Sequence, residues 1–279
     1  MKVKALFLIP LIVCIGLLYA NAEYKSVESI EKNQSGGNTV GSRFPVPSGF
    51  ERTDENPNSF GYFLRNLPLK KTGTLVKYHD GDSKPDDAYV AVVDLPIGTK
   101  DLHQCADAVM RLRADYLFSQ KQYDKIHFNF TNGFRVDYAK WREGYRIAVK
   151  GNKTSWVKKL KPDHSAKAYW DYLEQIFQFA GTASLEKELK PITSVSNIQI
   201  GDVFIKGGFP GHAVIVVDMA VNEQGKKIFM LAQSYMPAQE LQILKNTNNS
   251  KISPWYSEDF GETLVTPEWT FKKSHLKRF

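Results

Sequence analysis

The stretch IGDVFIKGGFPGHAVIVVDMA, residues 200–220, decides the fold class. It predicts a strand over 198–205, a turn-rich loop over 207–211 and a nearly continuous apolar strand over 212–219. A second apolar strand over 228–235 follows the turn signal Asn-Glu-Gln-Gly. Because short turns join these strands, we expect them to pair in antiparallel fashion.

Helical patterns precede this β-rich third of the chain. Apolar residues recur at helical spacing over residues 100–120, with Thr99 as the expected N-cap. Residues 164–180 form a second amphipathic pattern that stops at Gly181. The sequence therefore predicts an α+β domain in which one main helix packs on an antiparallel sheet.

Residues 121–190 form an aromatic-rich insertion between the two parts. Apolar and polar residues alternate over 126–131, Asn132-Gly133 indicates a tight turn, and residues 146–149 are expected to be the returning strand. Two interpretations stay open: the aromatic side chains are the core face of a sheet, or with nearby arginines they hold a sugar or an anionic polymer. The candidate substrate-binding residues are His127, Asn129, Arg135, Trp141, Arg142 and Tyr235.

The N-terminus predicts the compartment. Residues 1–22 have a short basic start, an apolar run and an Ala-Asn-Ala end, which is typical of a cleaved secretory signal. The alternatives are an uncleaved membrane anchor and lipid attachment at Cys14. Residues 23–43 are expected to be a flexible tether, and residues 44–279 a single domain. We therefore expect an exported protein, periplasmic or associated with the cell envelope.

The composition is that of a folded globular protein, with 42% hydrophobic and 13% aromatic residues in 279. Lys and Arg number 37 against 30 Asp and Glu, a formal charge of +7. We take this excess as spread along the chain, and with export expected we predict no nucleic-acid partner. No segment beyond the N-terminus is apolar enough to span a bilayer. The six His are scattered, so we expect no metal and no other cofactor.

Once the signal is removed, Cys105 is the one cysteine of the chain. A thiol near a helix start is activated by a neighbouring imidazole, and His212 opens a strand after the Gly-rich loop. If Asp218 lies opposite Ile228 in the hairpin, Gln233 or Tyr235 comes within reach of His212 and can orient its ring. The candidate catalytic residues are Cys105, His212 and Gln233.

Other interpretations of the same residues stay open. Cys105 lies on the apolar face of its helix and is equally well explained as a buried core residue. His212 can be a residue that caps its loop by hydrogen bonding. Asp202 and Asp218 are a weaker candidate pair of glycosidase carboxylates.

Six segments of the chain resemble a family of exported bacterial proteins known only as a domain of unknown function. The resemblance covers about residues 44–279, and it implies one family-length domain without an established activity. The segments are LRNLPLK (64–70), QCADAVMRLRADYL (104–117), HFNFTNGFRVDYAKWREGYR (127–146), LEKELKP (185–191), IGDVFIKGGFPGHAVIVVDMA (200–220) and AQSYMPAQE (232–240).

A second resemblance is local. Gly201-Asp202-Val203-Phe204, followed by Gly211-His212 and an apolar strand, is similar to the His-bearing half of bacterial cell-wall endopeptidases of the papain-like clan. In that clan the Cys starts a helix and the His follows on a sheet. The expected helix puts Cys105 about one turn inside, and Gln104 precedes it where those enzymes often carry Asp.

Two functions of different classes are expected, the first implied by the local resemblance together with the Cys105–His212 pattern and the second suggested by the aromatic and arginine residues of the insertion. The first is a papain-like cysteine peptidase or amidase acting on cell-wall peptide, with Cys105 as nucleophile, His212 as base and Gln233 as orienter. The second is a non-catalytic envelope protein that binds glycan or peptidoglycan through the aromatic–Arg segment.

Overall fold

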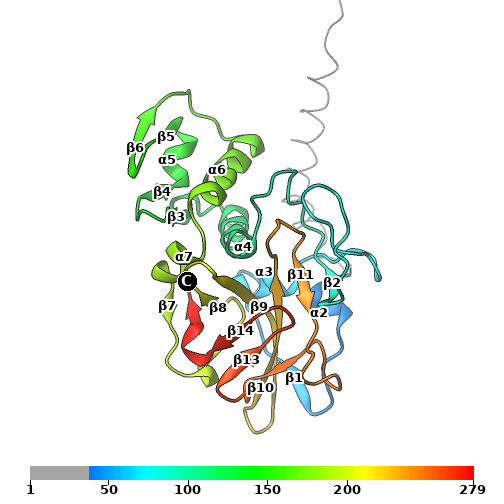
Figure 1. Ribbon diagram of the computed structural model, residues 1–279. Coiled ribbons are helices and arrows are strands. Elements are labelled where there is room, and N and C mark those ends of the chain that lie inside the picture. Colours follow the sequence, from blue (N-terminus) through cyan, green and yellow to red (C-terminus); the bar gives the residue numbers. More distant parts are fainter. Residues whose placement is uncertain (1–37) are drawn as a thin grey trace, which may run out of the picture.

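A computed structural model of the protein describes residues 38–279 (Figure 1). The predicted signal peptide, residues 1–22, lies outside the described residues. The helices are α2 (Val40–Arg43), α3 (Phe60–Arg65), α4 (Cys105–Ser119), α5 (Tyr138–Arg142), α6 (Ala166–Phe179) and α7 (Thr182–Glu188). The strands are β1 (Phe50–Arg52), β2 (Tyr89–Val92), β3 (His127–Asn129), β4 (Arg135–Asp137), β5 (Tyr145–Lys150), β6 (Lys153–Lys158), β7 (Lys190–Pro191), β8 (Val203–Lys206), β9 (His212–Asn222), β10 (Lys227–Gln233), β11 (Gln242–Leu244), β12 (Tyr256–Ser257), β13 (Thr263–Val265), β14 (Thr270–Lys272) and β15 (Leu276–Arg278).

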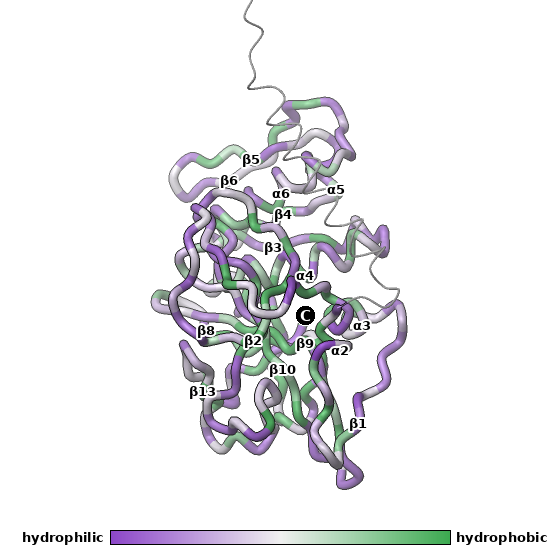
Figure 2. Tube along the Cα trace, turned by 90° about the vertical axis from the view of Figure 1, so that its right-hand side faces the viewer, coloured by the Kyte–Doolittle hydropathy of each residue, from purple (hydrophilic) through white to green (hydrophobic). Residues whose placement is uncertain are grey.

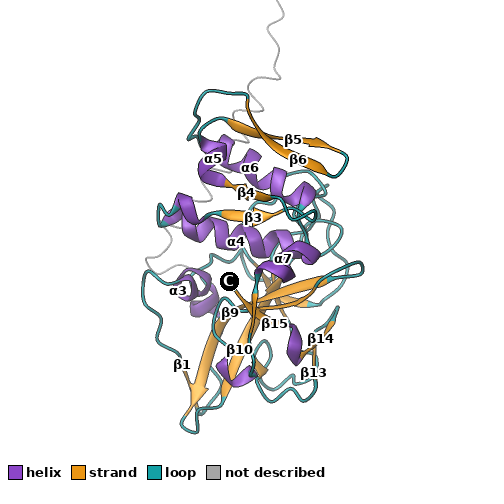
Figure 3. Ribbon diagram, turned by 90° about the vertical axis from the view of Figure 1, so that its left-hand side faces the viewer, coloured by secondary structure: helices purple, strands orange, loops and turns teal. Residues whose placement is uncertain are grey.

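A nine-stranded sheet forms the main layer. Its path runs β2-β11-β10-β9-β8-β15-β7, with β1 paired to β9 and β12 paired to β10, and every pairing is antiparallel. Helix α4 packs on β9 and lies across one face of this sheet (Figure 3). The structure therefore confirms the predicted α+β class, with an antiparallel sheet under one main helix.

The core lies where the sequence is most continuously apolar. Residues 212–220 of β9 and 228–233 of β10 are all buried, because α3 and α4 pack on these strands and the rings of Trp269 and Phe271 pack against His212. Figure 2 shows the hydrophobic stretches gathered along β9 and β10 and the hydrophilic ones toward the outside. Burial of this apolar surface is the main contribution to folding free energy.

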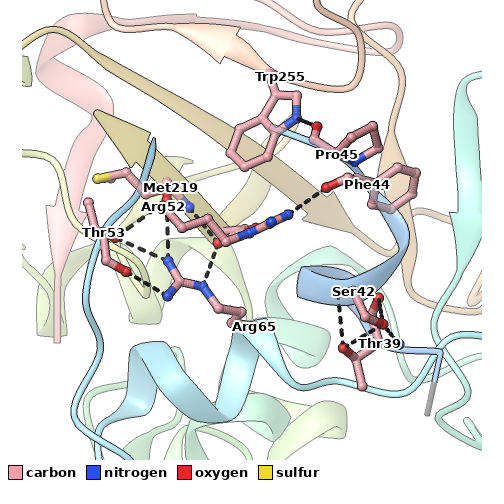
Figure 4. Close-up of polar contacts among 10 residues, drawn as sticks. Thr39, Ser42, Phe44, Pro45, Arg52, Thr53, Arg65, Met219 and Trp255 are labelled. Carbon is pink, nitrogen blue, oxygen red and sulfur yellow. Dashed lines mark hydrogen bonds and ion pairs between the residues drawn. The ribbon is translucent and has the colours of Figure 1, made fainter. Parts of the chain in front are cut away.

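A buried carboxylate joins the N-terminal segment to the central strand. Asp218 of β9 is fully buried, and its two oxygens accept bonds from Arg52 Nε at 2.8 Å and Arg65 Nε at 2.6 Å. Arg65 also bonds the backbone oxygens of Thr53 and Met219 (Figure 4). A second buried carboxylate, Asp202, is held by Arg278 at 2.6 Å. Both candidate glycosidase carboxylates are thus engaged by arginine in ion pairs that join distant segments.

Residues 38–43, which were expected to belong to the tether, are described by the structure and contact the rest of the domain. Val40 is fully buried, and Thr39 and Ser42 cap α2 by bonding each other's backbone N–H. The Arg43 guanidinium bonds the Lys70 carbonyl at 2.5 Å. Residues 38–43 are therefore packed against the domain, and only the earlier part of the expected tether lies outside the described residues.

Most of the insertion lies beside the main sheet, although α7 packs on β8 and Lys190 pairs within that sheet as part of β7. Strands β3 and β4 make one hairpin across Asn132-Gly133, as the turn signal predicts, and β5 pairs only with β6 in a second hairpin. The strand that returns from the Asn-Gly turn is therefore β4, and the expectation that residues 146–149 return from it is wrong. Helix α6 buries Tyr169, Leu173 and Phe177.

In residues 38–279 no helix combines the length and the apolar character needed to span a bilayer.

Candidate functional site

Cys105 is the first residue of α4, not a residue one turn inside it. The helix starts later than expected because Asp101 Oδ1 accepts the Ala238 N–H at 2.6 Å and the Gln104 side-chain amide at 3.0 Å, which holds the preceding segment out of the helix. Asp107 Oδ2 then caps the helix by accepting the Gln104 N–H at 3.0 Å. The free N–H groups and the positive end of the helix dipole therefore lie at Cys105.

His212 is the first residue of β9, as expected, but the register of the hairpin differs from the expected one. Asp218 lies opposite Met230, not Ile228, and a bulge follows between Met230 and Leu231. Because a one-residue shift turns every later side chain to the other face, the bulge places Gln233 on the same face as His212. His212 Nε2 lies 2.7 Å from Gln233 Oε1.

A hydrogen-bonded chain fixes the proton on this imidazole. The Glu268 carboxylate contacts the Lys84 ammonium at 2.7 and 2.8 Å, and it accepts a bond from the Gln233 amide nitrogen. Gln233 must then turn its oxygen toward His212, so His212 Nε2 carries the hydrogen. Nδ1 is left with a lone pair, and it makes no hydrogen bond within residues 38–279.

Cys105 and His212 line one cavity of about 350 Å³. The backbone N–H of Ala213, the residue after His212, also faces the thiol and favours its thiolate form. No hydrogen bond joins the sulfur to the imidazole among the described residues. The remaining lining residues are Gln104, Ala106, Asp107, Phe177, Ala180, Gly181, Thr182, Gly208, Phe209, Pro210, Gly211, Tyr235, Met236 and Trp269.

The thiol is less acidic than its place at a helix start predicts. Burial raises the pKa of Cys105 to about 11, and the nearby Asp107 carboxylate raises it further against the effect of the backbone N–H groups. The effect of burial on the thiol pKa therefore outweighs the opposing effect of the helix start. Burial also raises the pKa of Asp107 well above its usual range, and Asp107 Oδ1 has no hydrogen-bond partner in the described residues.

The imidazole is also neutral at rest. Burial lowers the pKa of His212 to about 4, against the opposing effect of the Gln233 hydrogen bond. Its ring is enclosed by the rings of Tyr235, Trp269 and Phe271, with centroid distances of 4.6, 5.5 and 5.9 Å. At neutral pH the cavity is thus lined by a thiol and a neutral imidazole, not by a preformed ion pair.

The mouth of the cavity is apolar and exposed. Phe209, on the loop between β8 and β9, is 95% exposed, and Met236, after β10, is 55% exposed. The loop needs glycine at two places: Gly208 has φ +114°, and a Cβ on Gly211 would lie 2.5 Å from the Gly208 carbonyl oxygen. This tight loop sets Phe209 at the rim beside His212.

The structure brings Tyr235 to this cavity but not the other candidate substrate-binding residues. Trp141 is buried, with its indole N–H bonded to the Ala168 carbonyl at 2.8 Å and the Arg146 guanidinium 4.0 Å from its ring centroid. Arg142 is stacked 4.0 Å from the centroid of Tyr123. The aromatic side chains of the insertion are therefore largely its own core.

The three remaining candidates are partly or fully exposed on the β3–β4 hairpin, and none lines the cavity. His127 Nδ1 is 3.1 Å from the Lys125 carbonyl oxygen, and Arg135 pairs with Asp137 at 2.7 Å. The Asn129 backbone N–H donates to Glu188.

Several residues of the site carry no signal in the sequence. Lys84 and Glu268 are 184 positions apart, and nothing in their neighbours indicates that they meet behind Gln233. Phe177 and Thr182 come to the cavity only through the way α6 and α7 pack. The Gly-rich loop was a visible signal, but it did not indicate that Phe209 would be exposed. Residues 38–279 hold no group of three or more His, Cys, Asp or Glu that could bind a metal ion.

Neither a curated protein nor a solved structure matches this chain. One family model does match, and it covers residues 40–278, which is nearly the whole described domain. The chain therefore belongs to the family described as a domain of unknown function (4846).

Proposed function

We propose that the protein is a cysteine peptidase or amidase with a papain-like arrangement of Cys105, His212 and Gln233. The observation that carries the proposal is the oriented imidazole: His212 Nε2 is bonded to Gln233 at 2.7 Å, its Nδ1 makes no hydrogen bond within residues 38–279, and His212 and Cys105 line the same cavity. A nucleophile, a base and a group that orients the base are the parts that acyl transfer requires.

The reaction starts from a neutral pair. Cys105 Sγ attacks the carbonyl carbon of the substrate amide while its proton passes to His212 Nδ1, because the thiol pKa of about 11 leaves little thiolate at neutral pH. The carbon–nitrogen bond then breaks, and the imidazolium gives its proton to the leaving amine. Water, deprotonated by His212, hydrolyses the thioester to a carboxylic acid and restores the thiol.

The N-terminus of α4 supplies charge stabilisation. The negative oxygen of the tetrahedral intermediate develops beside the Cys105 sulfur, where the Cys105 backbone N–H is free of intrahelical bonds. The exposed Phe209 and Met236 offer an apolar rim on which an extended peptide segment rests.

Cell-wall peptide is the substrate class we propose. It is supported by the local resemblance around His212 to cell-wall endopeptidases, by the position of Cys105 as the first residue of a helix, and by the expected export. The insertion at 121–190 is then the segment that separates the Cys-bearing helix from the His-bearing sheet.

The test is digestion of isolated peptidoglycan by the purified protein, with released peptides followed by mass spectrometry. We expect new amine-bearing fragments from the wild type and none from Cys105→Ser or His212→Ala. The exposed His164→Ala serves as the matched control and should retain activity. Circular dichroism shows whether each variant is folded. The assignment is overturned if Cys105→Ser, folded as the wild type, still releases the same fragments.

A non-catalytic envelope protein that binds glycan through the aromatic–Arg segment is the second candidate function. It has less support, because Trp141 is buried and Arg142 and Arg146 are stacked on rings of the same unit.

A further inference from the structure

The net positive charge of the chain equals the surplus of one short segment. Residues 140–161 contain eight Lys or Arg and a single acidic residue, Glu143, whereas the rest of the chain holds 29 basic and 29 acidic residues. From the composition we expected this surplus of positive charge to be spread along the chain. That expectation is wrong, because the surplus lies in residues 140–161. The whole net charge of +7 belongs to α5, the β5–β6 hairpin and the three residues that follow it.

Five lysines of this segment are exposed and unneutralised. We call residues 145–161 the lysine hairpin; its exposed cations are Lys150, Lys153, Lys158, Lys159 and Lys161. None of these five forms an ion pair within residues 38–279, although many surface lysines elsewhere do, such as Lys100 with Glu174 at 2.6 Å. A cluster of unpaired cations attracts an anionic partner at long range.

Apolar side chains are exposed among these cations. Val149, Val157 and Leu160 are 42%, 38% and 53% exposed. The rings of the hairpin, in contrast, are occupied: Lys140 and Lys158 lie over Tyr145, and Trp156 contacts Phe134. Aliphatic groups among lysines suit the interfacial region of a membrane, whereas single-stranded nucleic acid needs free aromatic faces for stacking.

The position of the hairpin leaves it accessible to a large partner. The hairpin lies at the end of the molecule farthest from β13 and β14 (Figure 3). By the register of the β5–β6 hairpin, Lys150, Lys153 and Val157 share one face, whereas Val149 and Lys158 lie on the other. None of the five lysines lines the Cys105 cavity.

We propose that the lysine hairpin docks the protein on an anionic phospholipid surface. The lysines supply attraction to the headgroups, and Leu160 enters the interfacial layer together with Val157, which shares a hairpin face with Lys150 and Lys153. This inference is independent of the proposed hydrolase activity, because it uses no residue of the cavity.

The test is co-sedimentation of the exported form of the protein with vesicles of mixed phosphatidylglycerol and phosphatidylcholine, or of phosphatidylcholine alone. We expect salt-sensitive binding to the anionic vesicles only. Each neutralised lysine should lower the partition coefficient about fivefold, so replacing all five hairpin lysines by Gln should lower it by about a hundredfold or more. Leu160→Ser should lower it about three- to tenfold.

Two matched control variants show whether an effect depends on where the replaced residues lie or only on which residue types are replaced. Lys71, Lys187, Lys190, Lys251 and Lys272, also exposed, are replaced together by Gln, which gives the same net charge as the hairpin variant. Leu75→Ser matches Leu160→Ser, because both leucines are 53% exposed. Both controls should bind as the wild type does.

Three results would overturn the proposal. The first is equal loss of binding in the hairpin variant and the lysine control, which would assign the effect to net charge. The second is vesicle binding that does not depend on headgroup charge or on salt, which is the result expected if an apolar N-terminal segment caused the binding. The third is binding of a DNA duplex, but not vesicles, that depends on the same five lysines.

Discussion

His212 Nε2 and Gln233 Oε1 lie 2.7 Å apart, on neighbouring strands whose pairing is shifted by a bulge. This contact decides which nitrogen of the imidazole can act as a base. Because Gln233 also donates to the acceptor-only Glu268 carboxylate, its oxygen is committed to His212, and Nδ1 is left for the thiol. The orientation of the base therefore depends on charged residues that line no part of the cavity.

Removing the Gln233 amide should impair catalysis although the nucleophile, Cys105, stays in place. We expect Gln233→Ala to lower kcat by about tenfold or more, since the ring loses its fixed tautomer. Nitrogen NMR of the imidazole should show the Nε2–H form in the wild type and a mixture in the variant. Gln224→Ala, in an exposed turn, is the control. An unchanged tautomer in Gln233→Ala would show that the hydrogen bond does not orient the ring.

Removing one partner of the Lys84–Glu268 ion pair should destabilise the fold more than replacing both partners. Lys84 is 2% exposed, so Glu268→Ala leaves a buried ammonium whose remaining acidic neighbour, Asp86, is 3.5 Å away and exposed. We expect a loss of about 3 kcal/mol in the free energy of unfolding, and recovery of most of it in the double variant with Lys84→Met. Denaturant unfolding measures both. If Glu268→Ala alone unfolds like the wild type, the pair does not hold this part of the fold.

The Cys105 thiol should titrate at high pH. Its pKa of about 11 predicts that alkylation by iodoacetamide accelerates about tenfold per pH unit through neutral and mildly alkaline pH and levels off near pH 11. Asp107→Asn should shift this profile to lower pH, because the carboxylate that opposes the thiolate is removed while the Asn oxygen can still cap Gln104. A profile centred near pH 9 or below in the wild type would mean that burial does not control this thiol.

The fold class could be predicted from the sequence because its signal is local. The unbroken apolar runs at 212–219 and 228–235 fall in β9 and β10, and the helical spacing over 100–120 contains α4. The start of α4 could not be predicted, because it depends on Asp101, which is held by the backbone of Ala238 more than 130 residues away. The spacing of apolar residues along a helix does not reveal contacts between residues so far apart in the sequence.

The candidate site was predictable only in part, for the same reason. Cys105, His212, Gln233 and Tyr235 were proposed from residue type and position. In the structure Cys105, His212 and Tyr235 line one cavity, and Gln233 lies behind it, bonded to His212. The bulge after Met230, which turns Gln233 toward His212, has no marker in the sequence. The pKa of Cys105 depends on how completely the helix start is covered, which composition does not reveal.

The loop between β8 and β9 should be sensitive to a single methyl group at Gly211. A Cβ there would lie 2.4 Å from Thr182 Oγ1 and 2.5 Å from the Gly208 carbonyl oxygen, and the second contact is with backbone that cannot rotate away. We expect Gly211→Ala to displace the loop, because real Cβ atoms do not approach so closely. Since Phe209 and His212 flank this position, the displacement should raise KM more than it lowers kcat if the loop contributes mainly to substrate binding.

Peptide release from peptidoglycan, measured over a range of substrate concentrations, separates the two kinetic constants for Gly211→Ala. Gly225→Ala, in the β9–β10 turn, is the matched control: no atom lies within 4 Å of its added Cβ, so only the backbone strain of its positive φ of +77° remains. The control should lose some stability and keep the wild-type KM. If the two alanine variants change KM equally, the effect comes from general destabilisation, and the loop does not shape the mouth of the cavity.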